Sequence, residues 1–199
     1  MKVTPPRIVL AAAVAGALGI AASLALNGPG PLLGTEAGQR ILNDALVAGT
    51  PTPAGVTVAR RGEALPAIQL AALDGDPIYL PDDFAGRPLL VNVWASWCGP
   101  CIKEMPELDR YAREQGEAGV QVLGLALDEP QAVHDFLQRI PVGYPLAIDA
   151  PGPADAGVRL GNPRGVLPYT VLVASDGRLL KQKIGPFADG EIDGWAVPQ

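Results

Sequence analysis

The feature that most constrains the fold is a nearly continuous apolar run that passes directly into a predicted helix. The run "PLLVNVWAS" covers residues 88–96, and the helix is predicted from about Cys98 to Gln115. A strand that is apolar on both faces has to lie inside a sheet that is covered on both sides. We therefore expect an α/β fold in which helices pack on the faces of a central sheet.

The pattern after Glu63 is one of strands alternating with helices. Residues 67–73 and 76–80 flank the turn signal Asp74-Gly75 and predict a β-hairpin. The further predicted elements are strands at 120–128 and 144–149, helices at 130–140 and 154–161, and a strand pair within 169–185. A strand-helix-strand-helix order that is followed by a hairpin predicts a mixed sheet.

The first segment of the chain predicts a membrane anchor. Residues 8–26 carry no charge, and as a helix they span about 28 Å, which is enough to cross a bilayer. Lys2 and Arg7 precede this run and the next basic residue is Arg40, so the positive-inside rule places the rest of the chain outside the cytoplasm. The alternative is a cleaved signal peptide, which leaves a soluble periplasmic protein. Both interpretations expose the thiols to the periplasm or its equivalent.

Composition and patterning predict one folded domain with an appendage. With 199 residues, of which 48% are hydrophobic, the chain suffices for a single ordinary core. We expect a signal anchor or transmembrane helix at 1–27, a Gly/Pro/Ala-rich tether at 28–62 that carries a short helix capped by Thr35, and the domain at 63–199 with a short or frayed end. A net charge of -6 and the absence of a basic run exclude nucleic-acid binding.

The two cysteines of the chain, Cys98 and Cys101, are separated by only Gly99 and Pro100. A structural disulfide across so short a loop removes little entropy from the unfolded chain. A metal site needs three or four ligands, and the chain offers no second cysteine pair and one histidine, His134. Redox exchange is the interpretation that remains, and we expect neither a metal nor a cofactor.

The context of the pair agrees with redox chemistry. Where a buried strand ends and a helix begins, unpaired backbone N–H groups and the helix dipole favour the thiolate form of Cys98. Cys101 lies one turn further along, in a more buried position, and is near enough to resolve a mixed disulfide formed by Cys98. Pro100 is tolerated because it falls in the first helical turn.

The segment "LLVNVWASWCGPCIKEMPEL" and the later "GVLPYTVLVASDGRL" carry a resemblance to a known family. Residues 63–185 resemble the thioredoxin superfamily, and specifically the membrane-anchored TlpA/ResA-like extracytoplasmic thiol-disulfide oxidoreductases. The resemblance implies a thioredoxin fold with an extra N-terminal β-hairpin.

The resemblance also implies roles for individual residues. Cys98 is the attacking thiol, Cys101 the resolving thiol and Pro168 the family's cis-proline beside the pair. A cis bond at Leu167-Pro168 presents the backbone of Leu167 to an extended substrate segment, whereas in the alternative Pro168 merely begins the next strand. The active-site motif and docking surface expected on this basis consist of Trp97, Gly99, Pro100, Leu167 and Pro168.

Asn92 and Glu104 stand where a proton-handling acid is expected. Thioredoxins commonly hold a buried aspartate six residues before the first cysteine, and here that position is Asn92, which does not titrate. ResA-like proteins have a functional glutamate three residues after the second cysteine, which corresponds to Glu104. The alternative for Glu104 is a solvated surface acid, the role we expect for Glu107 and Asp109.

The function that the resemblance implies is disulfide reduction outside the cytoplasm. The expected electron donor is a membrane thiol-transfer protein, and the expected substrates are apocytochrome c, a copper chaperone or another secreted protein. One alternative is a disulfide oxidant or general disulfide reductase, because the direction of exchange depends on thiolate stabilisation. The other is a thiol-based metal chaperone or binding domain.

Overall fold

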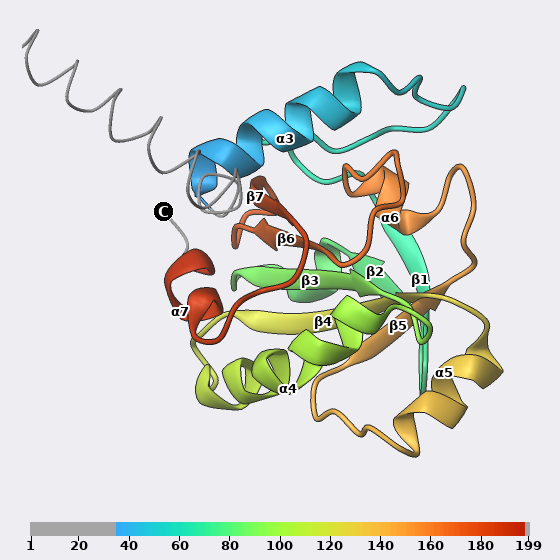
Figure 1. Cartoon of the computed structure of the whole chain (residues 1–199), viewed down its shortest axis with the longest axis vertical. Coiled ribbons are helices and arrows are strands. Elements are labelled where there is room, and N and C mark those ends of the chain that lie inside the picture. Colours follow the sequence, from blue (N-terminus) through green and yellow to red (C-terminus); the bar gives the residue numbers. More distant parts are fainter. Residues whose placement is uncertain (1–34, 198–199) are drawn as a thin grey trace, which may run out of the picture. The chain divides into compact units, whose positions relative to one another are not determined.

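A computed structural model describes residues 35–197 (Figure 1). The chain divides into two compact units after Leu42, and the account below concerns the second, apart from the start of α3 (Glu36–Ala48). Thr35 caps this helix as predicted, because its Oγ1 accepts the N–H of Gly38 at 3.1 Å. Within residues 35–197 no helix is long and apolar enough to cross a membrane. The anchor predicted at residues 8–26 lies outside the described residues.

The centre of the fold is a seven-stranded mixed sheet, as predicted. Its strands are β1 (Ile68–Ala72), β2 (Ile78–Leu80), β3 (Leu89–Trp94), β4 (Gln121–Leu127), β5 (Leu146–Asp149), β6 (Tyr169–Val173) and β7 (Leu179–Ile184). They lie in the order β2-β1-β5-β4-β3-β6-β7. The pairs β3–β4 and β4–β5 are parallel, and the others are antiparallel. The hairpin β1–β2 is thus confirmed, and it joins the sheet through β5.

Helices cover both faces of this sheet (Figure 1). The elements are a 3₁₀ turn η1 (Asp82–Phe84) and the helices α4 (Gly99–Glu114), α5 (Pro130–Leu137), α6 (Ala156–Arg159) and α7 (Glu191–Trp195). Side chains of α4 and α5 pack on one face, and those of α6 on the other. Every residue of β3 is buried, which is what its continuous apolar sequence predicts.

Gly124 of β4 permits a close approach on the α4 side of the sheet. It pairs with Asn92 in the parallel ladder. A Cβ atom at this position would lie 2.5 Å from Cδ2 of Leu146 and 2.9 Å from Cε2 of Tyr144. Only a residue without a side chain fits beneath these two groups.

Residues 43–62, predicted as part of a tether, make several contacts with the sheet unit. Asn43 Nδ2 donates to Oε1 of Gln182 at 3.0 Å, and Arg164 Nε donates to Oγ1 of Thr50 at 2.9 Å. The N–H of Ala59 donates to a carbonyl of α6 at 2.8 Å. The domain boundary at residue 63 stays a prediction.

Of the two alternatives for the C-terminal end, short or frayed, the described residues agree with the short one, since α7 (Glu191–Trp195) has five residues. Trp195 of α7 is buried, and its ring centroid lies 5.3 Å from that of Phe187 in an edge-to-face contact. Ile192 is fully buried in the same cluster. Aromatic packing therefore fixes an end whose glycines and proline suggested looseness.

Candidate active site

The cysteine pair lies at the N-terminus of α4. Cys98 is the N-cap residue, its carbonyl accepts the N–H of Ile102 at 3.1 Å, and its Sγ accepts the N–H of Cys101 at 3.3 Å. The two sulfur atoms form a disulfide with a bond of 2.02 Å. Cys101 is completely buried and Cys98 is 5% exposed, in the predicted order. Backbone N–H groups at this helix end stabilise negative charge on Cys98 when the disulfide is open.

The turn before Cys98 is held by a carboxylate from the neighbouring strand. Asp128 Oδ2 accepts the backbone N–H of Ser96 at 2.8 Å and its hydroxyl at 2.7 Å. Ser96 follows β3 and Asp128 follows β4, and these parallel strands end at the same edge of the sheet. We did not predict this contact, although polar residues after adjacent parallel strands are a usable signal.

The expected docking residues gather around the disulfide. Leu167 packs against the buried cluster that contains both cysteines, and the Leu167-Pro168 peptide is cis, as expected. A second cis peptide, Leu80-Pro81, was not predicted. Trp97 is 71% exposed beside Cys98. Gly99 and Pro100 are exposed as well.

Trp94 lies in the core, as predicted. It is fully buried and its ring centroid lies 5.2 Å from that of Phe136. The two tryptophans near this turn therefore differ in environment, because Trp94 is buried in the core and Trp97 is exposed to solvent.

Glu104 is a buried acid, and the alternative of a solvated surface group is wrong. Only 2% of the residue is exposed. Its Oε1 accepts from Nδ2 of Asn92 at 2.8 Å, and its Oε2 accepts the backbone N–H of Phe187 at 2.9 Å. Burial raises the pKa of Glu104 to about 7, although both hydrogen bonds and the charge of Lys183 act in the opposite direction. Near neutral pH this carboxyl is therefore able both to take and to give a proton.

A row of polar side chains crosses the sheet beneath Glu104. Asn92 of β3 pairs with Thr170 of β6, and Thr170 pairs with Lys183 of β7. Asn92 Nδ2 also donates to Oγ1 of Thr170 at 3.0 Å. Lys183, whose side chain is 4% exposed, forms an ion pair of 2.7 Å with Glu191. The sequence marks Asn92 as a residue that does not titrate, and a lone amide inside an apolar strand is also a signal for a buried hydrogen-bond partner.

Glu107 differs from the expected solvated acid. It accepts from Nη2 of Arg110 at 2.7 Å and from the backbone N–H of Gly190 at 2.9 Å. Mainly through the contact with Arg110, the pKa of Glu107 is lowered to about 2. Glu107 thus joins α4 to the segment that precedes α7.

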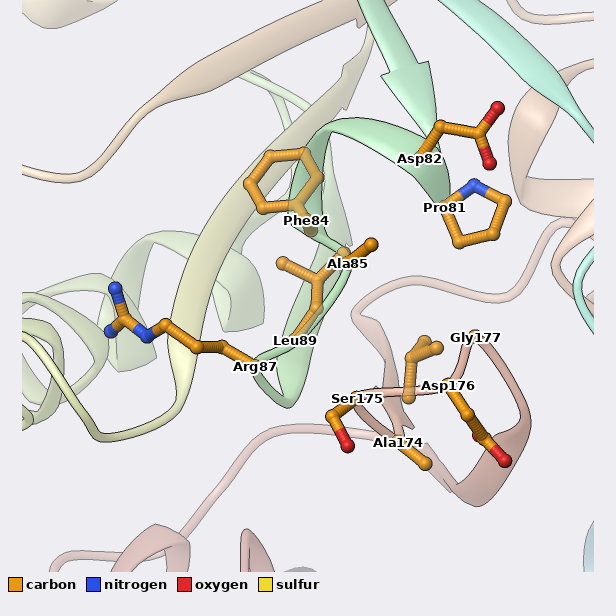
Figure 2. Close-up of a pocket in the computed structure, with 11 residues that line it drawn as sticks. Pro81, Asp82, Phe84, Ala85, Arg87, Leu89, Ala174, Ser175, Asp176 and Gly177 are labelled. Atoms are coloured by element: carbon orange, nitrogen blue, oxygen red, sulfur yellow. The ribbon is translucent and has the colours of Figure 1, made fainter.

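A cavity of about 120 Å³ lies at the opposite end of β3 (Figure 2). In Figure 2 two turns line this cavity, one around Pro81 and Phe84 and the other around Ser175 and Asp176. Leu89, the first residue of β3, also lines it, whereas Cys98 follows the last residue of that strand. The cavity is therefore separate from the cysteine site.

The sequence of this chain matches a known family and known proteins. Residues 60–194 match the Redoxin family. Thiol-disulfide oxidoreductase ResA of Bacillus thuringiensis (strain Al Hakam) is 31% identical over 137 residues, covering 67% of this chain and 75% of the relative. Sporulation thiol-disulfide oxidoreductase A of Bacillus subtilis (strain 168) is 24% identical over 148 residues, covering 72% and 86%.

Solved structures agree with the thioredoxin-like fold. A thioredoxin-related protein from Neisseria meningitidis serogroup B superposes with a TM-score of 0.55 at 30% identity, covering 63% of this chain and 93% of that one. StoA from Bacillus subtilis superposes with a TM-score of 0.55 at 23% identity, covering 68% and 100%. Because it shares both sequence and fold with these relatives, the chain belongs to the Redoxin family and, within it, to the ResA-like thiol-disulfide oxidoreductases.

Proposed function

We propose that this protein is a membrane-tethered protein-disulfide reductase whose catalytic domain faces the periplasm. Residues 8–26 anchor it in the inner membrane, Cys98 attacks the substrate, Cys101 resolves the mixed disulfide and Glu104 exchanges a proton with Cys101. The observation that carries this proposal is the place of Glu104, which is a buried acid on the same helix as the cysteine pair and has a pKa of about 7.

The reduction proceeds in two exchange steps. The Cys98 thiolate attacks one sulfur of the substrate disulfide, and the other substrate sulfur leaves as a thiolate and takes a proton from water. Glu104 in its ionised form then accepts the thiol proton of Cys101. The resulting Cys101 thiolate attacks the Cys98 sulfur, which forms the Cys98–Cys101 disulfide and releases the second substrate sulfur as a thiolate. This thiolate takes a proton from water, and Glu104 returns its proton to solvent. Two electrons pass to the substrate, and the protein is oxidised.

The proposed partners follow from the direction of exchange. A membrane thiol-transfer protein returns two electrons to the Cys98–Cys101 disulfide. Apocytochrome c, a copper chaperone or another secreted protein is the substrate. The exposed Trp97 and the segment Leu167-Pro168 form the surface on which the substrate's cysteine segment docks.

Equilibration of the full chain with glutathione buffers tests the direction. A reduction potential near that of thioredoxin, about -270 mV, supports a reductant, and one near that of DsbA, about -120 mV, contradicts it. Trapping with Cys101→Ser tests the order of attack and captures the substrate as a mixed disulfide with Cys98. Recovery of equal amounts of mixed disulfide on Cys101 in Cys98→Ser would contradict the assigned roles.

Glu104→Gln tests the proton transfer. We expect slower resolution of the mixed disulfide and an altered titration of the Cys101 thiol, because glutamine accepts no proton. Glu117→Gln is the matched control, since Glu117 is an exposed acid in the turn after α4. If Glu104→Gln leaves both the thiol titrations and the exchange rate unchanged, the proton-transfer role is wrong.

A further inference from the structure

The carboxyl group of Glu104 has two hydrogen-bond donors of different origin. Asn92 belongs to β3, which leads directly into the cysteine turn. Phe187 lies 83 residues after Glu104, beyond the last strand of the sheet, and donates its backbone N–H. One half of the carboxyl is thus held by the sheet and the other half by the C-terminal segment, residues 185–196, which we name the C-terminal strap.

Charged contacts fix the strap at several points. Glu191 pairs with Lys183 of β7 at 2.7 Å and accepts the backbone N–H of Ala188 at 2.8 Å through its other oxygen. Asp193 accepts from Arg110 of α4 at 2.8 Å. With the bond between Glu107 and the N–H of Gly190, these contacts join the strap to both α4 and β7.

Buried side chains also hold the strap against α4 and the sheet. Phe187, Ile192 and Trp195 are buried in one cluster with side chains of α4 and the sheet. The ammonium group of Lys183 lies 5.1 Å from the centre of the Phe187 ring. Lys181, also buried, donates to the carbonyl of Trp195 at 3.0 Å. The backbone at Phe187 therefore has a defined position relative to α4.

We propose that the C-terminal strap is a positioning element for Glu104, which it serves by delivering the Phe187 N–H to Oε2 and by keeping water from the carboxyl. This inference rests on the proposed proton transfer by Glu104, and it names the segment that sets the acidity of this carboxyl. The contacts described above, which hold the strap in place, lie on the strap, α4 and β7, and none of them involves a cysteine.

The titratable groups that face Glu104 come from β7, α7, α4 and the segment before β5. Lys183 of β7 favours its ionised form and Glu191 of α7 opposes it. Tyr144, which lies before β5, is affected in turn by the charge of Glu104. Cys101 lies one helical turn earlier on α4 and is in the disulfide. Detachment of the strap removes one hydrogen bond, which by itself raises the pKa of Glu104, but it also admits water. Because burial is the largest influence on this pKa and the strap contributes to it, we expect the net change to be a lower pKa.

Trp195→Ala tests the strap without changing any charge. Removal of the ring that supports Phe187 is expected to speed hydrogen exchange of the Phe187 amide by at least about tenfold. The pKa of Glu104, followed by carboxyl ¹³C NMR in the oxidised and reduced full chain, is expected to fall from about 7 toward 4.5. The acidic limb of the pH profile of disulfide exchange is expected to move with it.

Tyr79→Ala is the matched control, because Tyr79 is an exposed aromatic residue on β2 at the far edge of the sheet. It should alter neither the Phe187 amide nor Glu104. If Trp195→Ala does not fold, Trp195→Leu keeps an apolar side chain and carries the same measurements. If neither of these variants speeds amide exchange, a chain that ends at residue 190 is measured.

The outcomes separate this inference from the proposed function. Faster amide exchange at Phe187 with an unchanged pKa of Glu104 overturns the inference, as does a Phe187 amide that stays protected in all of these variants. Hydrogen exchange of the Phe187 amide and the pKa of Glu104 are both measured without catalytic turnover. If the pKa of Glu104 falls but the pH profile of exchange does not follow, the strap positions Glu104 as inferred, and it is the proton-transfer role in the proposed function that is wrong.

Discussion

Opposing influences act on the acidity of Glu104, and burial outweighs the others, so that its pKa is raised from 4.5 to about 7. Burial favours the neutral carboxyl, whereas the donors Asn92 and Phe187 and the cation of Lys183 favour the carboxylate. The pKa of Glu104 is about 7 because ionisation of this carboxyl costs more in the folded protein than in the unfolded chain. The free energy of unfolding therefore depends on pH through this group. The residue that we propose for proton exchange is thus also a source of pH-dependent stability.

The first prediction concerns this linkage. Folded Glu104 holds its proton up to about pH 7, but the unfolded chain releases it near 4.5, so the contribution of Glu104 to stability is complete below pH 4.5 and is lost as the pH rises through 7. We expect the unfolding free energy of the native chain, relative to Glu104→Gln, to fall by about 3 kcal/mol between pH 4.5 and 8. Urea unfolding of the oxidised proteins at several pH values measures the difference, and parallel curves would contradict the prediction.

The second prediction concerns Asn92. Asn92→Leu removes a donor to the carboxylate while keeping a side chain of similar volume, so the pKa of Glu104 should rise further above 7. Carboxyl ¹³C NMR measures the shift. Thr170→Val serves as the control, because it removes the other partner of Asn92 and leaves the bond to Glu104 in place. An equal shift in both variants would assign the effect to packing.

At the scale of elements, α4 brings the reactive groups together. Cys98 caps this helix, and Cys101 and Glu104 follow at successive intervals of three residues, so the helix repeat places them along one side. Apolar periodicity and the strand-to-helix junction predicted this element and its start from the sequence. The contacts of Glu104 with Phe187 and of Ser96 with Asp128 were not predicted. The Glu104 contact involves only the backbone N–H of Phe187, which every residue except proline carries and which leaves no mark in the sequence, whereas the Ser96–Asp128 pair was marked by polar residues after adjacent parallel strands.

The third prediction concerns the turn before α4. Trp97 is 71% exposed, so Trp97→Ala should change the unfolding free energy by no more than about 0.5 kcal/mol. If its ring is part of the docking surface, kcat/KM toward a protein disulfide should fall about tenfold, and the rate with oxidised glutathione should stay the same. Tyr79→Ala removes another exposed ring as a control. Equal losses on both substrates would point to a disturbed cysteine turn in place of a docking role.

At the scale of the whole molecule, the sequence predicted a mixed sheet but not the order of its strands. Alternation of strands and helices determines that parallel neighbours exist, yet the place of the hairpin beside β5 depends on packing between residues distant in the chain. The same reason explains the buried end of the chain, where Trp195 meets Phe187. Local composition, rich in glycine, gave no hint of this tertiary contact.

The last prediction concerns the anchor at residues 8–26. As a helix, its uncharged length would be sufficient to span a bilayer, and the positive-inside rule predicts from Lys2 and Arg7 that the N-terminus lies in the cytoplasm. We expect the full chain to remain with membranes after alkaline carbonate washing. We also expect protease to digest the domain only when the protease has access to the periplasmic face of the membrane. Leu18→Arg should release it or prevent its export, because a charge at the centre of the span costs about 3 kcal/mol on insertion scales. Ala37→Arg, outside the run, is the matched control. Recovery in the soluble periplasm with a new N-terminus near residue 26 would instead support the cleaved signal peptide, and the redox site would face the same compartment in either case.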